Sequence, residues 1–379
     1  MSAGTDGSSP FDAYLRSFQE APGYLNFASY GPPSLAVIET IGALAHDASL
    51  GRASAQLHAQ DRRGLAAVSR LTGFDPDAVT LTTSTSLGLL QVAFGLPRGE
   101  VLVSEAEFPA NLYAWWRSED AGLTRVRSLP IIAGGPLAPV TPERVAAAVR
   151  PDTVAVAVSA VDFRTGTRAD LAGLREAVGD RLLIVDGIQG FGVLDIDWTV
   201  ADALVVGGQK WLRAGWGAGF TALSPRALER LLPRLGGWTG VEDPSRYDGR
   251  RHPPLPGAQR LSVTNASPFA SGALATALEV IETVGVAAIH DRIAATAERL
   301  IAGLAEAGVS VLSPTRHDDR AGIVVARTPS GNASSATDRL ADAGITVTGH
   351  GPDRVRFSVH ATTTTDAIDA AVEVMANIP

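Results

Sequence analysis

Lys210 is the only lysine in this chain of 379 residues, and every other residue among its 32 lysines and arginines is arginine. A guanidinium stays protonated in proteins, whereas a desolvated ammonium can lose its proton and attack a carbonyl carbon. A lysine that stands alone in an arginine-rich chain is therefore a candidate nucleophile. The alternative, a lysine left by chance, is weighed against the sequence around it.

Two predicted strands bring an acid and this lysine to one edge of a sheet. The apolar segment 181–185 is followed by Asp186, and Gln189 comes three residues later in a glycine-flanked turn. A second apolar segment, 202–206, leads through Gly-Gly-Gln to Lys210. Ligands of parallel sheets bind beyond the carboxyl ends of the strands. An amine that must meet an aldehyde, beside a carboxylate for a ring nitrogen, indicates pyridoxal phosphate as the cofactor.

The phosphate of such a cofactor requires a hydroxyl-rich turn at the start of a helix. Free backbone N–H groups and the helix dipole favour an anion there. The predicted strand 78–82 runs into Thr-Ser-Thr-Ser-Leu-Gly at 83–88, which an apolar helical run follows. Thr85 and Ser86 are the candidate phosphate ligands, and an ordinary helix N-cap is the alternative.

The elements that position these residues alternate along the chain. Short apolar runs separated by amphipathic stretches predict a mostly parallel sheet with helices on both faces, an α/β fold. We predict strands at 78–82, 100–104, 124–128, 153–159, 181–185 and 202–206, and further ones at 309–312, 322–327, 345–348 and 353–359. We predict helices from Thr141-Pro142-Glu143, at 169–178, within the Ala-rich region 268–308, at 333–343 and at 364–376.

The chain is expected to have three parts. Residues 1–20 are predicted to form a flexible N-terminal arm. Residues 21–256 are predicted to form a large cofactor-binding domain, and residues 257–379 a smaller α+β domain. A long loop rich in Gly, Pro, Asp and Arg, at 235–258, precedes the second domain.

Composition excludes several classes of protein. The net charge of −8 argues against general nucleic-acid binding, because neutralising phosphates needs a basic surface. No apolar stretch reaches the roughly 18 residues of a membrane span, and the first residues lack the features of a secretory signal. The absence of cysteine excludes a cysteine nucleophile. The histidines show no metal-ligand spacing, so we expect no metal. Together with the charge, the hydropathy and the absence of cysteine, this leads us to expect no membrane, no nucleic acid and a cytoplasmic location.

Two motifs together resemble a known family. Val-Asp-Gly-x-Gln at 185–189, paired with Gly-x-Lys-Trp at 208–211, resembles the class V aminotransferase group of fold-type I pyridoxal-phosphate enzymes. This group includes cysteine desulfurases, selenocysteine lyases, kynureninases and isopenicillin N epimerase-like proteins. The resemblance extends from Tyr24 to about Val374. It implies the fold-type I transferase fold and a homodimer whose active sites are shared between subunits.

The resemblance also implies roles for residues around the cofactor. Lys210 forms a Schiff base with the cofactor and then moves the Cα proton, Asp186 keeps the pyridine nitrogen protonated, and Gln189 bonds the ring hydroxyl. The other expected cofactor contacts are Thr85, Ser86, Phe108, Ser159, Gln209 and Asn265. Phe108 takes the place of a stacking histidine, so it can stack but cannot transfer a proton; a plain core position is the alternative.

The substrate is expected to be an amino acid. The segment Arg354–His360 alternates with period two, so Arg356 and His360 share one face of a strand. By the resemblance, Arg356 holds the substrate carboxylate, for which a planar bidentate donor is suited. A solvated strand face is the alternative. Asn26, Arg164 and His360 complete the expected substrate side, with a surface ion pair as the alternative for Arg164.

The chain departs from the family pattern at several positions. Gly207 stands where the family has Ser or Thr, and Gln209 where it has His. Thr264-Asn265 replaces the family's Gly-Thr loop, which reaches the phosphate across the dimer, so that contact is left open. Because no cysteine exists, a persulfide-forming desulfurase is excluded.

The expected reaction begins with removal of the Cα proton of an amino acid. Transamination or β-elimination of the C–S lyase type is expected to follow. Epimerisation and kynureninase-like hydrolysis remain open on the same residues. A non-catalytic binding protein with this fold is the alternative outside enzymes.

Overall fold

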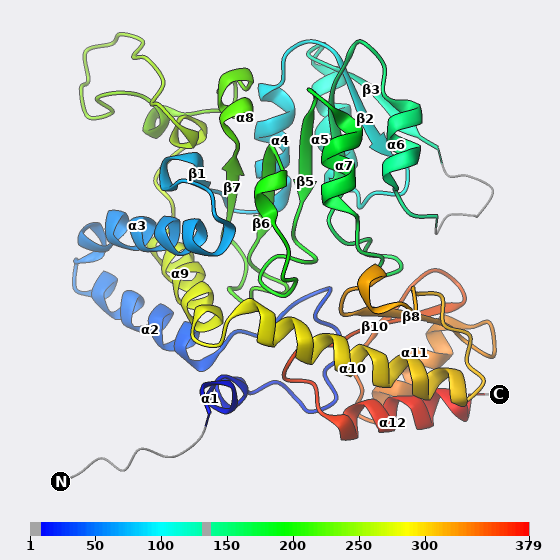
Figure 1. The fold of residues 1–379 in the computed structure, drawn as a ribbon. Coiled ribbons are helices and arrows are strands. Elements are labelled where there is room, and N and C mark those ends of the chain that lie inside the picture. Colours follow the sequence, from blue (N-terminus) through cyan, green and yellow to red (C-terminus); the bar gives the residue numbers. More distant parts are fainter. Residues whose placement is uncertain (1–8, 131–137, 379) are drawn as a thin grey trace.

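The computed structural model describes residues 9–130 and 138–378, and its main feature is a seven-stranded sheet (Figure 1). The strand order is β1-β7-β6-β5-β4-β2-β3. The strands are β1 (Val79–Leu81), β2 (Glu100–Ser104), β3 (Arg125–Leu129), β4 (Thr153–Ser159), β5 (Leu182–Asp186), β6 (Ala203–Gly207) and β7 (Gly219–Leu223). Strands β2 to β6 are parallel and β7 is antiparallel to both of its neighbours. The predicted mostly parallel sheet is confirmed, and the six strands predicted for it lie within one residue of the observed ones.

Helices cover both faces of this sheet. This is shown by alternate residues of β5, which belong to two different core clusters. Leu182 and Ile184 belong to the cluster that contains Trp115 of α5. Leu183 belongs to the cluster that contains Leu174 of α7. The helices between the strands are α4 (Thr85–Gly95), α5 (Ala110–Asp120), α6 (Pro142–Ala148) and α7 (Leu171–Val178), and α8 (Pro225–Arg230) follows β7. The carboxyl ends of the parallel strands are left open for a site.

A smaller antiparallel sheet lies in the C-terminal part of the chain. Its order is β8 (Ile323–Arg327), β10 (Arg354–Ser358) and β9 (Thr348–Gly349), with α11 (Ala333–Asp342) and α12 (Thr365–Ala376) beside it (Figure 1). The predicted strand at 309–312 is reduced to an isolated bridge between Val311 and Ala326, although Ser310 and Leu312 also form backbone hydrogen bonds with β8. The predicted division of the chain at residues 256 and 257 stays a prediction.

The Ala-rich region predicted at 268–308 forms two helices. They are α9 (Pro268–Glu282) and α10 (Val286–Glu306), and α9 packs against α2 (Leu35–Ser49) and α3 (Ala53–Thr72) (Figure 1). Within the described ranges no single helix is long and apolar enough to cross a membrane; α9 and α10 pass that test only as a pair bent by 79°.

The N-terminal segment begins with a helix that packs on the core. Helix α1 (Pro10–Arg16) begins at a capping box formed by Ser9 and Asp12. Tyr14 of this helix is buried and lies edge-on to Phe18, with 5.0 Å between ring centroids. Tyr14 anchors residues 10–16 to the core, and the predicted arm over residues 1–20 stays a prediction. Residues 1–8 lie outside the described residues.

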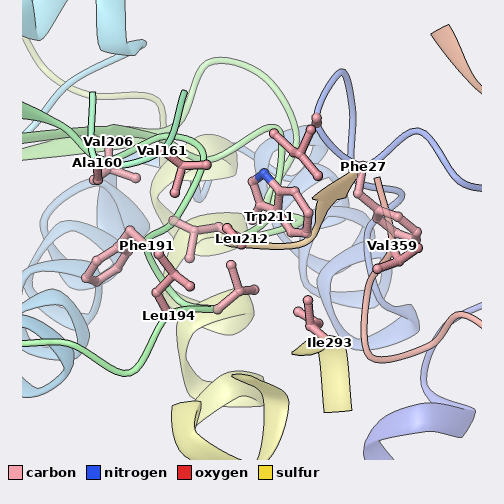
Figure 2. Close-up of a cluster of buried hydrophobic side chains, with 14 of the residues drawn as sticks. Phe27, Ala160, Val161, Phe191, Leu194, Val206, Trp211, Leu212, Ile293 and Val359 are labelled. Atoms are coloured by element: carbon pink, nitrogen blue, oxygen red, sulfur yellow. The ribbon is translucent and has the colours of Figure 1, made fainter. Parts of the chain in front are cut away.

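The larger core cluster connects the lysine turn to the smaller sheet. Trp211, directly after Lys210, lies in this cluster together with Phe27, Ile293 and Val359 (Figure 2). Phe27 comes from the N-terminal part of the chain, and Val359 directly follows β10. The backbone around Lys210 is therefore held by packing from three distant parts of the sequence.

Candidate active site

Polar side chains gather at the carboxyl ends of the parallel strands. Asp186 is the last residue of β5, and in the strand register it pairs with Ser159, the last residue of β4. Lys210 lies three residues beyond Gly207, where the neighbouring β6 ends. The structure therefore brings the acid and the lysine to one edge of the sheet.

Lys210 is a buried amine, with 9% of its surface exposed. Burial lowers its pKa to about 8; the charge of Asp186 opposes this shift, and the charge of Arg356 adds to it. The Nζ atom lies 5.2 Å from the centroid of the Phe108 ring. A lysine with this pKa is partly neutral near physiological pH, which is the state that attacks a carbonyl carbon.

Asp186 is a buried carboxyl group whose charged form is only partly compensated. Burial raises its pKa to about 6, while the Ile188 N–H and the charge of Lys210 act in the opposite direction. The Ile188 N–H donates to Oδ1 at 3.0 Å. A desolvated carboxylate of this kind gains most from a cationic partner, such as a protonated ring nitrogen.

Gln189 is held by the protein on both ends of its amide. Nε2 donates to the carbonyl oxygen of Ala28 at 3.1 Å, and Oε1 accepts from Trp211 Nε1 at 2.7 Å. An amide nitrogen carries two hydrogens, so one donor is left for a ligand.

The start of α4 provides an anion site. Ser84 caps the helix, and its hydroxyl accepts from the Leu87 N–H at 3.2 Å. Thr85 is buried, and its Oγ1 has no hydrogen-bond partner among the residues that the structure describes. Ser86 is exposed at the first turn. The first N–H groups of a helix have no carbonyl partner within the helix, and here the Ser84 hydroxyl takes that of Leu87, so the remaining ones suit an anion.

Gly207 leaves room beside that hydroxyl. A Cβ at this position would lie 2.9 Å from Thr85 Oγ1 and 2.7 Å from Gln209 Oε1. A serine or threonine there would require the ends of the Gln209 and Thr85 side chains to move. An unpartnered hydroxyl beside an open glycine and a helix N-terminus fits a phosphate, and Lys210 and Asp186 fit the ring of pyridoxal phosphate.

Asn265 lies in the exposed loop before α9. Together with Thr83 and Thr264 it lines a cavity of about 670 Å³ beside the start of α4. Whether this loop serves the phosphate of its own chain or of a partner stays a prediction.

Glu107 is a site residue that the sequence analysis missed. Its carboxyl group is buried and accepts from the Ser159 hydroxyl, from the Ser159 N–H at 3.0 Å and from Asn111 Nδ2 at 3.1 Å. Burial raises its pKa to about 7, and the charge of Asp186 adds to this shift. The spacing Glu-x-x-x-Asn at the start of α5 is the signal that could have shown it. Ser159 therefore donates to Glu107, which leaves its hydroxyl only lone pairs for a cofactor.

Glu107→Gln is expected to weaken the pH dependence of the free energy of unfolding of the cofactor-free protein. The folded carboxyl stays protonated to about pH 7, whereas its ordinary pKa is 4.5. The folded state thus binds more protons between these values, and stability falls as the pH rises through them. Urea unfolding at pH 5 and pH 8 should show a smaller difference in the variant. An equal difference in both proteins contradicts a titrating Glu107.

Arg356 is a buried guanidinium with neutral partners. It is 7% exposed; Nη2 donates to Ser29 Oγ at 2.8 Å and Nη1 to the Phe163 carbonyl at 3.2 Å. Its Nε has no partner within the described part of the chain, and burial lowers its pKa to about 10. The alternative of a solvated strand face is wrong. No carboxylate of the described residues pairs with it, and such a buried cation is suited to bind an anion.

The other expected substrate contacts are placed differently. Arg164 forms an ion pair with Asp162 at 2.5 Å, which favours the ion-pair alternative. His360 is buried in the core, 4.9 Å from Phe27 and 6.0 Å from Trp211 between ring centroids, and this place argues against contact with a substrate. Asn26 Oδ1 accepts from the Thr348 hydroxyl at 2.7 Å, near the smaller sheet.

An aromatic group beside Arg356 was also missed. Phe163, whose carbonyl Arg356 bonds, lies edge-on to Phe108 with 5.2 Å between ring centroids. His350 lies 5.6 Å from Phe163, and burial together with nearby arginines lowers its pKa to about 4. The rings beside Lys210 and Arg356 are thus uncharged at neutral pH.

The chain is similar to known proteins over most of its length. Residues 41–370 match the family model described as aminotransferase class-V. The kynureninase of Deinococcus radiodurans is 28% identical over 309 residues, 78% of this chain and 72% of that protein. The isopenicillin N epimerase of Streptomyces clavuligerus is 32% identical over 340 residues, 83% of each. The solved structure of the cystine C-S lyase C-DES with its product cysteine persulfide has a TM-score of 0.85 at 21% identity, covering 94% of this chain and 97% of that one.

Proposed function

Because this chain belongs to the class V aminotransferase family and is an enzyme that uses pyridoxal phosphate, we propose that it removes the Cα proton of an amino acid and then completes a transamination or a C–S lyase-type β-elimination. The observation that carries the proposal is the buried amine of Lys210. The charges of Asp186 and Arg356 both lie near enough to shift its pKa. The amine and the acid would serve the cofactor, whose ring nitrogen needs a carboxylate. The cation of Arg356 would serve the carboxylate of an amino-acid substrate.

The residues described above would hold the cofactor as follows. Asp186 would pair with the ring nitrogen, Thr85 and the start of α4 would take the phosphate, and Phe108 would cover the ring. Gln189 would donate to the ring hydroxyl with its remaining hydrogen. Bound there, pyridoxal phosphate supplies an electron sink for the charge that develops at Cα.

The chain's own residues divide the remaining work. Arg356 binds and orients the substrate carboxylate, and Lys210 takes the proton from Cα and returns it. Phe108 is 41% exposed, so it is not a plain core residue, and its ring lies edge-on to Phe163 on the side of the amine where a cofactor ring would stack. Phe108 cannot move a proton, the lowered pKa of His350 makes it a weak base, and the carboxyl group of Glu107 is held by Ser159 and Asn111. Lys210 is therefore the group assigned to move the Cα proton, and a single such group favours transamination or elimination over epimerisation, which needs a second proton donor on the opposite face.

Epimerisation or kynureninase-like hydrolysis is the second candidate. The 32% identity to an isopenicillin N epimerase and the 28% identity to a kynureninase favour it. The aromatic group of Phe108, Phe163 and His350 would also accommodate an aromatic substrate side chain.

Product analysis distinguishes these reactions. The holoenzyme is incubated with a panel of L-amino acids that includes L-cystine and L-kynurenine, with and without a 2-oxo acid as amino acceptor. We expect a shift of the visible absorption band and formation of a 2-oxo acid, with ammonia released only if elimination operates. Racemised amino acid without any 2-oxo acid, or cleavage of L-kynurenine alone, would support the second candidate instead.

Arg356→Met is expected to raise the KM for the amino acid about 10- to 100-fold, because a hydrogen bond to a charged group contributes about 1.5–3 kcal/mol. The change in kcat should be smaller, since the contact is made with bound substrate. Arg356→Lys keeps the charge but lacks the planar guanidinium. Its KM should lie between those of the wild type and of Arg356→Met. Steady-state kinetics on the best substrate of the panel measures this; an unchanged KM in Arg356→Met contradicts the assigned role.

A homodimer is part of the proposal. Tyr247 is 91% exposed, and together with the exposed Trp238 it lines the same cavity as Asn265. Exposed aromatic side chains around a hollow are typical of an interface. A second copy seated there would bring its Asn265 loop near the start of α4. Sedimentation equilibrium should give twice the chain mass of 39.3 kDa. The cytoplasmic location expected from the sequence belongs to the same proposal.

A further inference from the structure

Arg213 has a backbone conformation that an arginine rarely adopts. It lies three residues after Lys210, and its N–H donates to the Lys210 carbonyl at 3.0 Å. Its φ is +60°, and Asp243 is the other non-glycine residue with positive φ in the described part of the chain. Such a conformation persists only where surrounding contacts impose it. The turn that carries the lysine is therefore held under strain by something outside it.

The side chain of Arg213 provides that hold. It is 3% exposed, and Nη2 donates to Glu20 Oε2 at 2.5 Å. Nε donates to the Pro32 carbonyl at 2.5 Å, and Nη1 to Thr362 Oγ1 at 3.3 Å. The second oxygen of Glu20 accepts from the Thr362 hydroxyl at 2.5 Å. The guanidinium carbon lies 3.5 Å from the Phe18 ring centroid. One buried ion pair thus joins the lysine turn to two distant segments.

The first of these segments lies directly on the lysine turn. Gly31, next to Pro32, donates its N–H to the Gln209 carbonyl at 2.9 Å. A Cβ at Gly31 would come within 1.9 Å of the Lys210 carbonyl oxygen, so no other residue fits there without a shift of the backbone. The hydrogen bond from Arg213 to the Pro32 carbonyl therefore helps to keep this segment in contact with the backbone of Lys210.

The second segment belongs to the smaller sheet. Thr362 follows β10, the strand that carries Arg356. The segment around Pro32 also reaches this strand: Ser29 Oγ accepts from Arg356 Nη2 at 2.8 Å, and the Ala28 N–H donates to Ser358 Oγ at 2.9 Å. The Lys210 turn and the Arg356 strand are thus connected through one junction.

We propose that the buried Glu20–Arg213 pair is a positioning device, which fixes the turn of Lys210 relative to Arg356 on β10. It sets the spacing between the group that receives the amine of the substrate and the group that receives its carboxylate. The statement about spacing to the carboxylate rests on the proposed function of Arg356. The statement that the pair holds the Lys210 turn does not, and it can be tested without the cofactor.

Labelling of the single lysine tests the hold on the turn. In the cofactor-free protein, reaction of the amine with trinitrobenzenesulfonate is followed against pH on the peptide that contains residue 210. The wild-type midpoint is expected at about 8. In both Glu20→Gln and Arg213→Met the midpoint should rise by about one pH unit, because a turn that is released exposes the amine to water. The two variants change the local charge in opposite directions. Opposite shifts of the midpoint would therefore show that charge alone acts, and they would overturn the proposal.

A double variant separates positioning from ordinary stabilisation. Breaking one partner of a buried pair leaves an uncompensated charge, whereas an apolar replacement of both is often neutral for stability. Glu20→Met/Arg213→Met should recover the thermal midpoint of the wild type but not the Lys210 midpoint. Recovery of both would make the pair purely structural and overturn the proposal. Asp202→Asn is the matched control: it breaks the Arg175–Asp202 pair, whose acid is buried at the start of β6. It should lower the thermal midpoint without moving the Lys210 midpoint.

The spacing is tested on the holoenzyme. The concentration of an L-amino acid that gives half of the absorption change is compared with that of the amine lacking its carboxylate. Glu20→Gln should lower the preference for the amino acid about tenfold, which corresponds to 1.4 kcal/mol. If Arg356→Met loses this preference while Glu20→Gln keeps it, the spacing claim is wrong. If Arg356→Met also keeps it, the proposed function of Arg356 fails, and the lysine labelling alone decides the hold on the turn.

Discussion

Lys210→Arg is expected to lower kcat/KM by at least about 10³-fold, because general acid–base catalysis alone contributes about 10²- to 10⁴-fold. Arginine keeps the positive charge beside Asp186, yet it can neither attack an aldehyde nor accept the Cα proton. The loss therefore reports on the chemistry of the amine rather than on the charge of the site. Kinetics on the best substrate of the amino-acid panel measures the effect.

Chemical trapping shows where the cofactor is attached. Borohydride reduction of the wild-type holoenzyme, followed by peptide mass mapping, should place a pyridoxyl group on the peptide containing residue 210 and nowhere else, since the chain has no other lysine. Lys210→Arg should give no such peptide, while its thermal midpoint confirms that it folds. A variant that keeps a tenth of the wild-type activity, or pyridoxyl found elsewhere, would remove Lys210 from the mechanism.

Asp186→Asn is expected to lower kcat about 10²- to 10³-fold, the usual effect of removing one electrostatic contact aimed at developing charge. Asparagine has the same shape and can still accept from the Ile188 N–H, so the variant removes the charge and little else. Without the Asp186 carboxylate the protein would not hold a proton on the ring nitrogen of the bound cofactor, which would then accept less charge from Cα. KM should change less than kcat, because Asp186 does not touch the substrate in this assignment.

Although Asp186→Asn should lower kcat, it should not lower the stability of the cofactor-free protein. Burial raises the pKa of Asp186 to about 6, above its ordinary value of 3.8. The folded protein therefore loses stability as the pH rises through this range, because the buried group must ionise. In the cofactor-free state at pH 8, Asp186→Asn should be at least as stable as the wild type in urea unfolding. Lower stability with unchanged kcat would identify Asp186 as a structural residue.

These effects share one cause, which is the cost of keeping charged groups buried without full compensation. Burial shifts the pKa of Lys210 downward and those of Asp186 and Glu107 upward. Groups with perturbed pKa values that cluster at one place are typical of catalytic sites. The cofactor and the substrate would supply the missing counter-charges, so ligand binding should stabilise the protein strongly.

Much of the fold could be predicted from the sequence, because apolar runs in a parallel sheet are buried on both faces. Strands β2, β4 and β6 could therefore be predicted from short continuous apolar segments of the sequence. The break between α9 and α10 and the reduction of the segment 309–312 to an isolated bridge were not predicted. They depend on what packs against each segment, and a local pattern does not contain that information.

The sequence by itself determined which residues carry the chemistry: one lysine, with Asp186 and Gln189 at a telling spacing and hydroxyls ahead of α4. The tertiary structure alone decided which other side chains share their surroundings. It buried His360 in the core beside Phe27, placed Ser29 against Arg356, and joined Glu20 to Arg213 across 193 positions of the sequence. Residue types and strand ends are local properties, whereas burial and ion pairing are fixed by contacts between segments that only the folded chain brings together.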